Sequence, residues 1–408
     1  LMELKMKYHY TYFIYPFVVK ENKYQKYLLS LIRNPRFSLR IFEKQKDITL
    51  YQYFLPKMSQ FLFSSFSFTK DKLDKLKDLP KDTVSAILAK YPCTIFEYDL
   101  KRDVQGKTDE GGIFFKIQKL QIICFNSGIC FLCMKTNIED SDNFSDLLNF
   151  NYKFRDIKQK GKRLNSYDKI HLQTDSFDDI SNLNNFIEEF TGSPVEAMKL
   201  DIDMDRFLTY SYVCIDSQNW DAQNDFEKIS YQFVKFTNFL PADNSVEYEE
   251  KEPISFTKWK YAKFGISKQG VVLFTSDASM NNYTVLPNDF ETVYLYTYIL
   301  NLYKKLYLKK LEYDFQNISK AKNARKKFVD FTKNLWIQEI TEDEVGSVLN
   351  YNISKILQIN KVYQKIKNQY DILYKEYHVE SNTKMLMVFS VILIVLLIFN
   401  ILNYFAMF

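Results

Sequence analysis

The sequence has little glycine and proline, with nine of each in 408 residues. This scarcity leaves little room for glycine-rich phosphate loops and excludes collagen-like segments. The five cysteines are odd in number and irregularly spaced, which favours free thiols in a reducing compartment over a disulfide framework. The 55 basic and 50 acidic residues are interspersed, and the short basic run at 320–327 is typical of a solvated helix face, not of a nucleic-acid-binding stripe.

Charged residues are also absent after Lys384, where residues 385–408 form one apolar run. As a helix, at about 1.5 Å per residue, this run is roughly 36 Å long, and a bilayer core is about 30 Å thick. A buried core helix of this length without charge is rare, so the run predicts a transmembrane helix. Lysines precede it, none follows, and the start of the sequence shows no signal peptide. The positive-inside rule then predicts a single-pass protein of the cell inner membrane with its bulk in the cytoplasm.

Two asparagines, Asn400 and Asn403, interrupt the apolar run near its far end. Residues three apart share one face of a helix, and polar groups in a membrane helix usually face protein or a water-filled cavity. Two interpretations stay open: the amides hydrogen-bond neighbouring helices, or they line the mouth of a pore. Asn400 and Asn403 are therefore the candidate pore-lining residues.

The residues before the apolar run begin with an α+β part. Runs rich in β-branched and aromatic residues predict strands, and the glycine-containing turn at 126–128 predicts that two of them form a hairpin. The predicted strands lie at 8–20, 37–42, 113–125, 129–137, 208–216 and within 259–275, and an early helix is predicted at 22–33.

After residue 287 the pattern becomes helical. Asn288 with Glu291 predicts one capped helix that continues to about residue 338, and Thr341 with Glu344 predicts a second capping box. Residues 347–384 contain no glycine or proline, which predicts an uninterrupted helix that runs into the membrane. The predicted organisation is an α+β cytoplasmic sensor domain at 1–287, a helical stalk at 288–384 and a transmembrane helix at 385–408.

A heptad repeat of apolar residues runs along this stalk. A sustained repeat at positions a and d favours packing against like helices, and tyrosine at three successive a positions indicates an assembly wider than a dimer. The other interpretation is an amphipathic helix that packs on its own domain. The predicted residues of self-association are Leu349, Ile356, Ile359, Tyr363, Ile366, Tyr370, Leu373 and Tyr377.

Motifs for phosphate or metal binding are incomplete. The run Gly106-Lys107-Thr108 lacks the first glycine of a phosphate loop, and a predicted strand follows it where that loop needs a helix. Cys130 and Cys133 lie in a predicted strand, where residues three apart point to opposite faces, so they do not share a metal ion.

Catalytic constellations are not evident either. The acidic run at 201–205 resembles the start of a calcium loop, but Arg206 stands where that loop needs glycine. His9, His171 and His378 lie far apart in the sequence, and none can be paired with a nucleophile. The sequence therefore predicts no enzyme, no cofactor and no metal site.

Residues 255–408 resemble the CorA family of metal-ion channels. The resemblance rests on the strand pair FGISKQGVVLF, on the helical runs FETVYLYTYILNLYKKLYLKKL and FTKNLWIQEITEDEVGSVLNYNISKIL, and on the long helix that enters the membrane. It implies an α/β cytoplasmic domain, a long stalk helix and five copies around a central ion path. The family's Gly-Met-Asn signature and second membrane helix are absent from this sequence, so the resemblance does not imply magnesium selectivity.

The hairpin FNSGICFLCMKTN, with LLNFNYKFRDI at 147–157, resembles a CorA-like subgroup encoded with type III CRISPR systems. This second resemblance implies an antiviral effector gated by a nucleotide second messenger, such as an adduct of S-adenosylmethionine and AMP. The first hypothesis is therefore a ligand-gated, homo-oligomeric membrane channel or membrane-disrupting effector. The alternative is a tail-anchored scaffold or receptor that recruits a soluble partner. The sequence does not identify the ligand-binding residues, and Arg33, Arg36 and Arg40 are examples of basic residues that could meet a phosphate.

Overall fold

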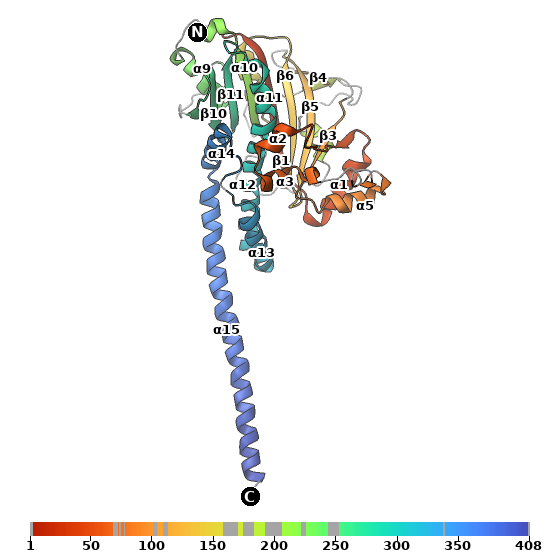
Figure 1. Cartoon of the computed structure of the whole chain (residues 1–408), viewed down its shortest axis with the longest axis vertical. Helices are drawn as coiled ribbons and strands as arrows, with labels where there is room; N and C mark the ends of the chain where they lie inside the picture. Colours follow the sequence, from red (N-terminus) through yellow and green to blue (C-terminus); the bar gives the residue numbers. More distant parts are fainter. Residues whose placement is uncertain are drawn as a thin grey trace.

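The computed structural model shows an α/β head from which one long helix extends (Figure 1). The structure describes residues 3–67, 72, 75–76, 78–100, 104–108, 113–157, 170–173, 183–191, 206–221, 226–243, 253–337 and 339–406.

An 11-stranded sheet forms the centre of the head, in the order β2-β3-β5-β6-β1-β8-β11-β10-β9, with β4 paired to β5 and β7. Strands β8 and β11 are parallel, and the other pairs of described strands are antiparallel. The strands are β1 (Met6–Val18), β2 (Phe37–Leu39), β3 (Cys93–Tyr98), β4 (Val104–Thr108), β5 (Phe114–Phe125), β6 (Ile129–Ile138), β7 (Ile170–Gln173), β8 (Leu208–Ile215), β9 (Ile254–Phe256), β10 (Ala262–Ser267) and β11 (Gly270–Ser276).

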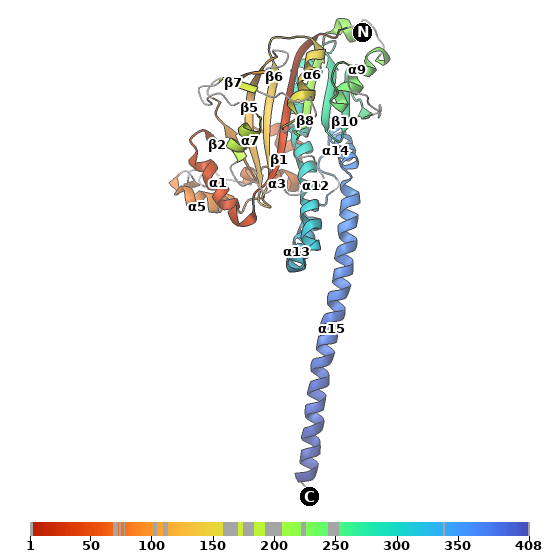
Figure 2. The ribbon, with the colours of Figure 1, turned by 180° about the vertical axis from the view of Figure 1, so that it is seen from behind.

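Helices cover both faces of this sheet, so the head has three layers (Figures 1 and 2). The alternation of side chains along β1 shows why: Tyr10, Tyr12 and Ile14 enter one hydrophobic core, while Phe13 and Phe17 enter the other. One face carries α1 (Tyr24–Arg33), α5 (Lys81–Leu88), α6 (Phe144–Phe154), α7 (Leu183–Thr191) and α9 (Glu227–Asn238). The other carries α2 (Ile48–Tyr53), α3 (Pro56–Leu62), α12 (Leu295–Gln316), α14 (Glu344–Ile356) and the start of α15 (Ile359–Ala406).

The strands predicted from sequence are confirmed as β1, β2, β5, β6, β8 and the β10–β11 pair, and the predicted early helix is α1. Short elements complete the head: η1 (Glu21–Lys23), η2 (Ser64–Ser67) and α8 (Ser217–Trp220). Strand β3 and the short strands β4, β7 and β9 were not predicted.

The helical part starts earlier than predicted and is broken in two. Asn288 and Glu291 do not cap a helix, because α10 (Asn281–Thr284), α11 (Leu286–Asp289) and the π-helical turn η3 (Phe290–Tyr294) already lead into α12. The predicted continuation to residue 338 is also wrong, because Asn317 is extended and ends α12. Helix α13 (Ile318–Asn334) then folds back along α12, as the ring contacts of Tyr307 with Phe331 and of Phe315 with Phe328 show.

The capping box predicted at Thr341 and Glu344 is wrong by two positions. Asp343 caps α14, because its carboxylate accepts a hydrogen bond of 2.6 Å from the backbone N–H of Gly346. The Thr341 hydroxyl instead donates to the carbonyl oxygen of Tyr53, which ties the start of α14 to α2.

The helix predicted to run unbroken from residue 347 into the membrane has a break at Leu357 and Gln358. Gln358 has a φ of 55°, in the left-handed region. The break changes which side of the helix faces the core. Ile353 is buried on α14, and in an unbroken helix the residue two turns later, Asn360, would also face inward. The break leaves Asn360 exposed and turns Ile359 inward instead.

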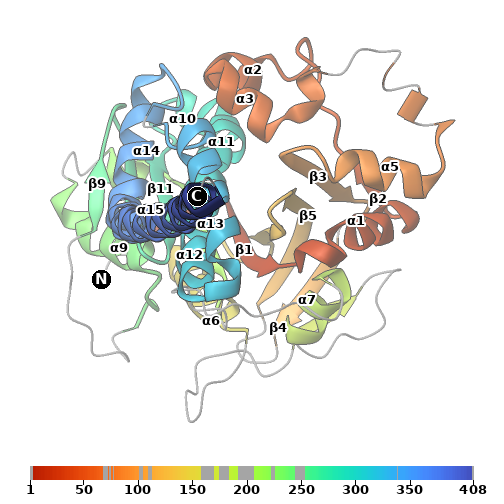
Figure 3. The ribbon, with the colours of Figure 1, turned by 90° about the horizontal axis from the view of Figure 1, so that it is seen from below.

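The sheet and the helices after residue 287 share one hydrophobic core. That core runs from Tyr10 on β1 through Leu300 on α12 to Ile366 on α15, so the predicted boundary at 287/288 falls inside it. Viewed from below, α12 and α13 lie beside α15 (Figure 3). The long helix therefore begins inside the head and leaves it without a linker.

Candidate functional site at the root of the apolar helix

The end of α15 is an apolar helix that nothing in the head covers. The window Asn382–Leu402 has a mean hydropathy of 3.0, and none of it is buried. At about 1.5 Å per residue its 21 residues are roughly 32 Å long, enough to cross a bilayer core. This is the one helix of such length and composition among the described residues.

The two predicted pore-lining residues lie at the far end of this helix. Asn400 is exposed, and the side chain of Asn403 is outside the part that the structure describes. A single helix encloses no water, so a role in a pore depends on further copies of the chain. Both residues stay predictions.

The predicted self-association residues divide along the helix. Leu349, Ile359, Tyr363 and Ile366 are buried within the chain, where α14 and α15 pack on α12 and α13. Ile356, Tyr370 and Leu373 are partly buried against the same core, and the side chain of Tyr377 is outside the described part. The first part of the heptad repeat therefore packs on its own domain, which is the second of the two interpretations given in the sequence analysis.

Aromatic stacking and ion pairs hold the root of α15 in place. The rings of Trp336 and Tyr363 stack with centroids 3.6 Å apart. Glu312 on α12 forms two ion pairs, one with Lys309 at 3.1 Å and one with Lys365 on α15. Burial alone would raise the pKa of Glu312, but its hydrogen bonds with these two lysines lower it on balance. A charged carboxylate therefore ties α15 to α12.

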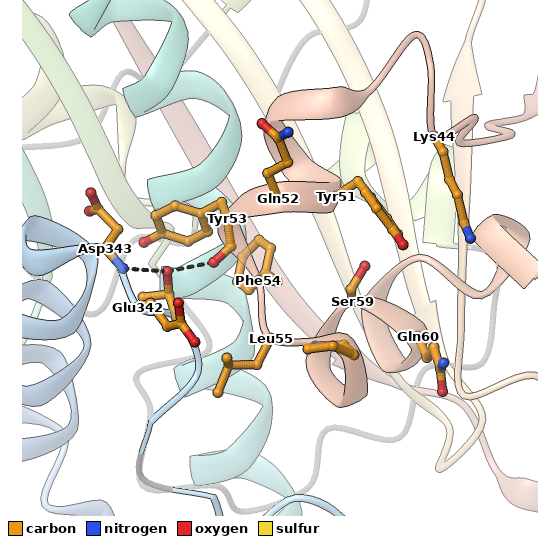
Figure 4. A pocket seen from close by; sticks show the side chains of 12 residues that line it. Lys44, Tyr51, Gln52, Tyr53, Phe54, Leu55, Ser59, Gln60, Glu342 and Asp343 are labelled. Atoms are coloured by element: carbon orange, nitrogen blue, oxygen red, sulfur yellow. Dashed lines mark hydrogen bonds between the residues drawn. The ribbon is translucent and has the colours of Figure 1, made fainter.

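Three cavities surround α14, the short helix from which α15 continues. The first, of about 510 Å³, lies at its N-terminus between α2, α3 and the Thr341 loop (Figure 4). Lys44 and Tyr51 face it from one side and Glu342 from the other. Thr341 bridges the two sides, because its hydroxyl also accepts from the backbone N–H of Asp343 at 3.1 Å.

The second cavity, of about 300 Å³, lies along the side of α14. Asn301 of α12 donates to the side-chain oxygen of Asn350 at 2.8 Å on its wall. Burial lowers the pKa of Lys304 to about 8, and its ammonium donates to the carbonyl oxygen of Ile337 at 3.1 Å. This cavity carries a polar network that joins α12 to α14.

The third cavity, of about 410 Å³, lies at the C-terminal end of α14, at the helix break. Cationic side chains dominate its wall, and sequence reasoning did not find it. The cations come from the end of α6, from the residue before β8, from the β10–β11 turn and from α12, so no short stretch of sequence holds more than one of them. The described residues that line it are Arg155, Arg206, Phe207, Leu208, Lys268, Gln269, Lys305, Ile356, Leu357 and Gln358.

The three arginines offered as examples of phosphate-binding residues do not converge on a cavity of this kind. Arg33 pairs with Asp82 at 3.1 Å, on the helices α1 and α5. The guanidinium of Arg36 donates to the Tyr98 hydroxyl at 3.1 Å. Arg40 pairs with Asp47 at 2.6 Å and stacks over Phe42.

The structure places two of the three motifs that the sequence analysis judged incomplete. Residues 106–108 lie in strand β4, not in a loop before a helix. Cys130 and Cys133 enter opposite cores of the sheet, as predicted. The described part of the chain contains no group of three or more potential metal ligands, and the acidic run 201–205 lies outside that part.

Of the three histidines, His9 alone has a described side chain. Its Nε2 accepts a hydrogen bond of 3.0 Å from the backbone N–H of Ile138, across β1 and β6. Burial lowers the pKa of His9 to about 4, so the ring is neutral at pH 7. His171 lies on β7 and His378 on α15.

No protein-family model, curated protein or solved structure matches this chain. The function is therefore inferred from the geometry of the chain itself.

Proposed function

We propose that this protein is a ligand-gated, homo-oligomeric membrane channel or membrane-disrupting effector of CorA-like architecture. The observation that carries the proposal is the rigid connection between the head and the apolar helix. Helix α15 begins in the core of the head, at the buried Ile359, and its 48 residues continue through the membrane-length window. A rotation of α14 or α12 is then passed to the apolar end, because no flexible linker absorbs it.

Several copies are needed for such an effect. One helix leaves no room for water, and its backbone is satisfied internally, so a pore requires a bundle of apolar helices. The resemblance to the CorA family favours five copies, with Asn400 and Asn403 facing the central path. The exposed Ile372 and Tyr374 on α15 offer apolar surface for association.

More specifically, the proposed channel or effector is a CRISPR-associated antiviral protein at the cell inner membrane, with its head in the cytoplasm. Its support is the resemblance of the β5–β6 hairpin and α6 to that subgroup, together with three cavities of ligand size around α14. The proposed ligand is a nucleotide second messenger of the S-adenosylmethionine–AMP type, and the protein is proposed to act without catalysis of its own.

The test is ion flux in liposomes that contain the purified full-length protein, with and without the S-adenosylmethionine–AMP adduct. Two variants carry seven extra residues between Lys375 and Glu376, which lie on the part of α15 outside the head. An all-alanine insert keeps the helix, and a glycine–serine insert of equal length breaks its rigidity. Flux that survives the alanine insert and disappears with the glycine–serine insert is expected. Absence of flux in the wild type with any nucleotide, together with a monomeric protein in detergent, would rule out the channel function.

The second candidate is a tail-anchored scaffold or receptor. It is favoured by the single membrane-length helix among the described residues. A scaffold needs only attachment, so an unrelated apolar helix of matched length should replace residues 385–408 without loss of function, and both inserts should be harmless. A channel fails the helix replacement.

A further inference from the structure

The turn between α12 and α13 carries a cluster of cationic side chains that the proposed function does not use. Lys320, Lys322, Arg325 and Lys326 lie in the first three turns of α13, and together they are called the basic tip. The side chains of the three lysines are exposed. Two opposite views show the basic tip projecting below the sheet, on the side toward which α15 extends (Figures 1 and 2).

The positive charge of this region follows from its composition and does not depend on which side chains are paired. Residues 309–334, which contain the basic tip, hold eight basic and three acidic residues, and residues 359–384 of α15 hold five lysines and three acidic residues. Glu21, which pairs with Lys310 and Lys327, adds one more acid and leaves a clear surplus of cations. The acidic residues of the two stretches are Glu312, Asp314, Asp330, Asp371, Glu376 and Glu380.

Two contacts with α15 bracket the height of the basic tip above the membrane-length window. Glu312 pairs with Lys365, and α12 ends five residues later at Asn317, which is then level with Tyr370, about 18 Å before Asn382. The rings of Phe328 and Tyr370 lie 5.5 Å apart, and α13 begins ten residues nearer the tip. That contact places the start of α13 about 15 Å beyond Tyr370, or roughly 3 Å before Asn382. The middle of this bracket is about one Debye length, which is about 10 Å at 0.1 M salt.

This position favours a lipid surface as the partner of the basic tip. Clusters of four to eight Lys and Arg residues beside a membrane helix attract anionic lipids, by about 1 kcal/mol for each charge near the surface. Once α15 is inserted, the basic tip is held beside the headgroups, so docking costs little further translational freedom. Tyr313, which lies near the tip and is 57% exposed, has the Lys320 ammonium 5.9 Å from its ring. Tyrosine is enriched at membrane–water interfaces, which fits the same surface.

Aromatic packing connects the basic tip to the long helix. Phe328, less than one turn from Lys326, contacts the rings of Tyr363 and Tyr370, with centroids 5.4 and 5.5 Å away. The Thr332 and Tyr363 hydroxyls lie 3.3 Å apart further along α13. A force on the basic tip is therefore passed to α15 through side chains that pack directly against it.

We propose that the basic tip docks on an anionic bilayer surface beside the point where α15 enters it, through its lysine and arginine side chains and the lipid phosphates. Docking holds the hairpin of α12 and α13 down and thereby sets the tilt of α15 in the membrane. The inference rests on the membrane insertion of α15 in the proposed function, and it does not depend on whether the protein conducts ions.

The test places a nitroxide on the exposed position 323 of the full-length protein, through Asn323→Cys, since the five native cysteines are buried. The protein is reconstituted in nanodiscs of phosphatidylcholine, with or without about 30 mol% phosphatidylglycerol. Collision of the nitroxide with a neutral, water-soluble nickel chelate should fall at least about twofold with phosphatidylglycerol and recover at about 1 M NaCl, where the Debye length is about 3 Å. Lys322→Gln/Lys326→Gln should remove at least about half of this difference, because two of the four charges are lost. The matched control Lys81→Gln/Lys90→Gln removes the same charge from exposed positions at α5 and should keep the difference.

Each other outcome overturns the docking or the function on which it rests. Equal collision rates in the two nanodiscs, in a protein that resists alkaline carbonate extraction, overturn the docking and leave the membrane function standing. Extraction of the wild type by carbonate shows that α15 is not inserted and overturns both. An equal loss in the two double variants assigns the effect to overall charge and removes the basic tip as the site. RNA binding in detergent that Lys322→Gln/Lys326→Gln abolishes, without a lipid effect, would make the partner a nucleic acid.

Discussion

At the scale of single residues, Glu291 shows how a charge is held against the sheet. Its carboxylate accepts from Lys135 on β6 at 2.5 Å and from the hydroxyl of Tyr12 on β1 at 2.7 Å. Burial alone would raise the pKa of Glu291, but the Lys135 ammonium and these hydrogen bonds lower it on balance. The carboxylate thus joins the π-helical turn before α12 to two central strands.

Glu291→Gln should lower the free energy of unfolding by about 3 kcal/mol at pH 7, because it leaves the Lys135 ammonium buried without its partner. The double variant Glu291→Leu/Lys135→Met should lose much less, since no charge stays behind. Because the folded pKa is lowered, the stabilisation exists above the unfolded value of about 4.3 and is lost as the pH falls through the folded value. Denaturant titration at several pH values checks both points, and equal losses for the two variants would contradict them.

His9 predicts a second, distinct dependence on pH. Its folded pKa of about 4 lies below the unfolded value of about 6.5, so the neutral ring stabilises the fold above pH 6.5. That stability, about 3 kcal/mol at most, should be lost as the pH falls from about 6.5 to about 4. His9→Gln keeps an acceptor for the N–H of Ile138 and should flatten the loss over this interval. An unchanged slope in the variant would show that another group titrates.

At the scale of elements, the break between α14 and α15 at Leu357 and Gln358 was not predicted from the sequence. Gln358 is exposed and left-handed, so Gln358→Gly removes the steric cost of that conformation. After the entropy cost of glycine is subtracted, the protein should gain up to about 1 kcal/mol. The matched change Gln364→Gly, on the exposed helical surface of α15, should cost about 1 kcal/mol. Thermal unfolding measures both, and a loss in both would mean that residues 357–358 are helical in solution.

The packing of α15 on the head gives another prediction at this scale. Ile366 is fully buried, whereas Ile372, nearly two turns on, is 58% exposed. Ile366→Ala should cost about 3 kcal/mol at any protein concentration, because its neighbours belong to the same chain. Ile372→Ala should cost less than about 0.5 kcal/mol if the exposed surface stays in solvent. A large, concentration-dependent loss for Ile372→Ala would place that surface in a contact between copies.

At the scale of the whole molecule, no described part of the head covers the apolar window Asn382–Leu402. The proposal of an oligomeric pore predicts a defined oligomer in detergent, measured by light scattering, with a pentamer expected from the CorA-like resemblance. Asn400→Leu/Asn403→Leu should reduce ion flux by about tenfold or more, because the amides are then lost from the pore mouth. Leu393→Asn/Leu396→Asn, the same exchange in reverse nearer the middle of the window, is the companion variant and should impair insertion instead. Normal flux in Asn400→Leu/Asn403→Leu would exclude these residues from the path.

The local sequence pattern was sufficient to predict the long strands and the apolar helix. Strands β1, β5 and β6 are long runs of β-branched and aromatic residues, and such runs form strands wherever a sheet can take them. The apolar run needs only its length and lack of charge to form a membrane-length helix. Short strands such as β2 and β9 have three residues each, and β9, which was not predicted, is defined by its partner β10 rather than by its own composition.

The sequence by itself determined a head of mixed strands and helices, the helical part and the apolar helix, because periodicity and hydrophobicity are properties of neighbouring residues. Only the tertiary structure decided which surfaces face which. The heptad positions Leu349 and Ile366 fit either a second chain or the chain's own α12, and packing assigned them to α12. The break at Gln358 follows from the same cause, since it restores the packing phase of α15. The cationic cavity at that break exists because folding brings together Arg155, Arg206, Lys268 and Lys305, which are distant in the chain.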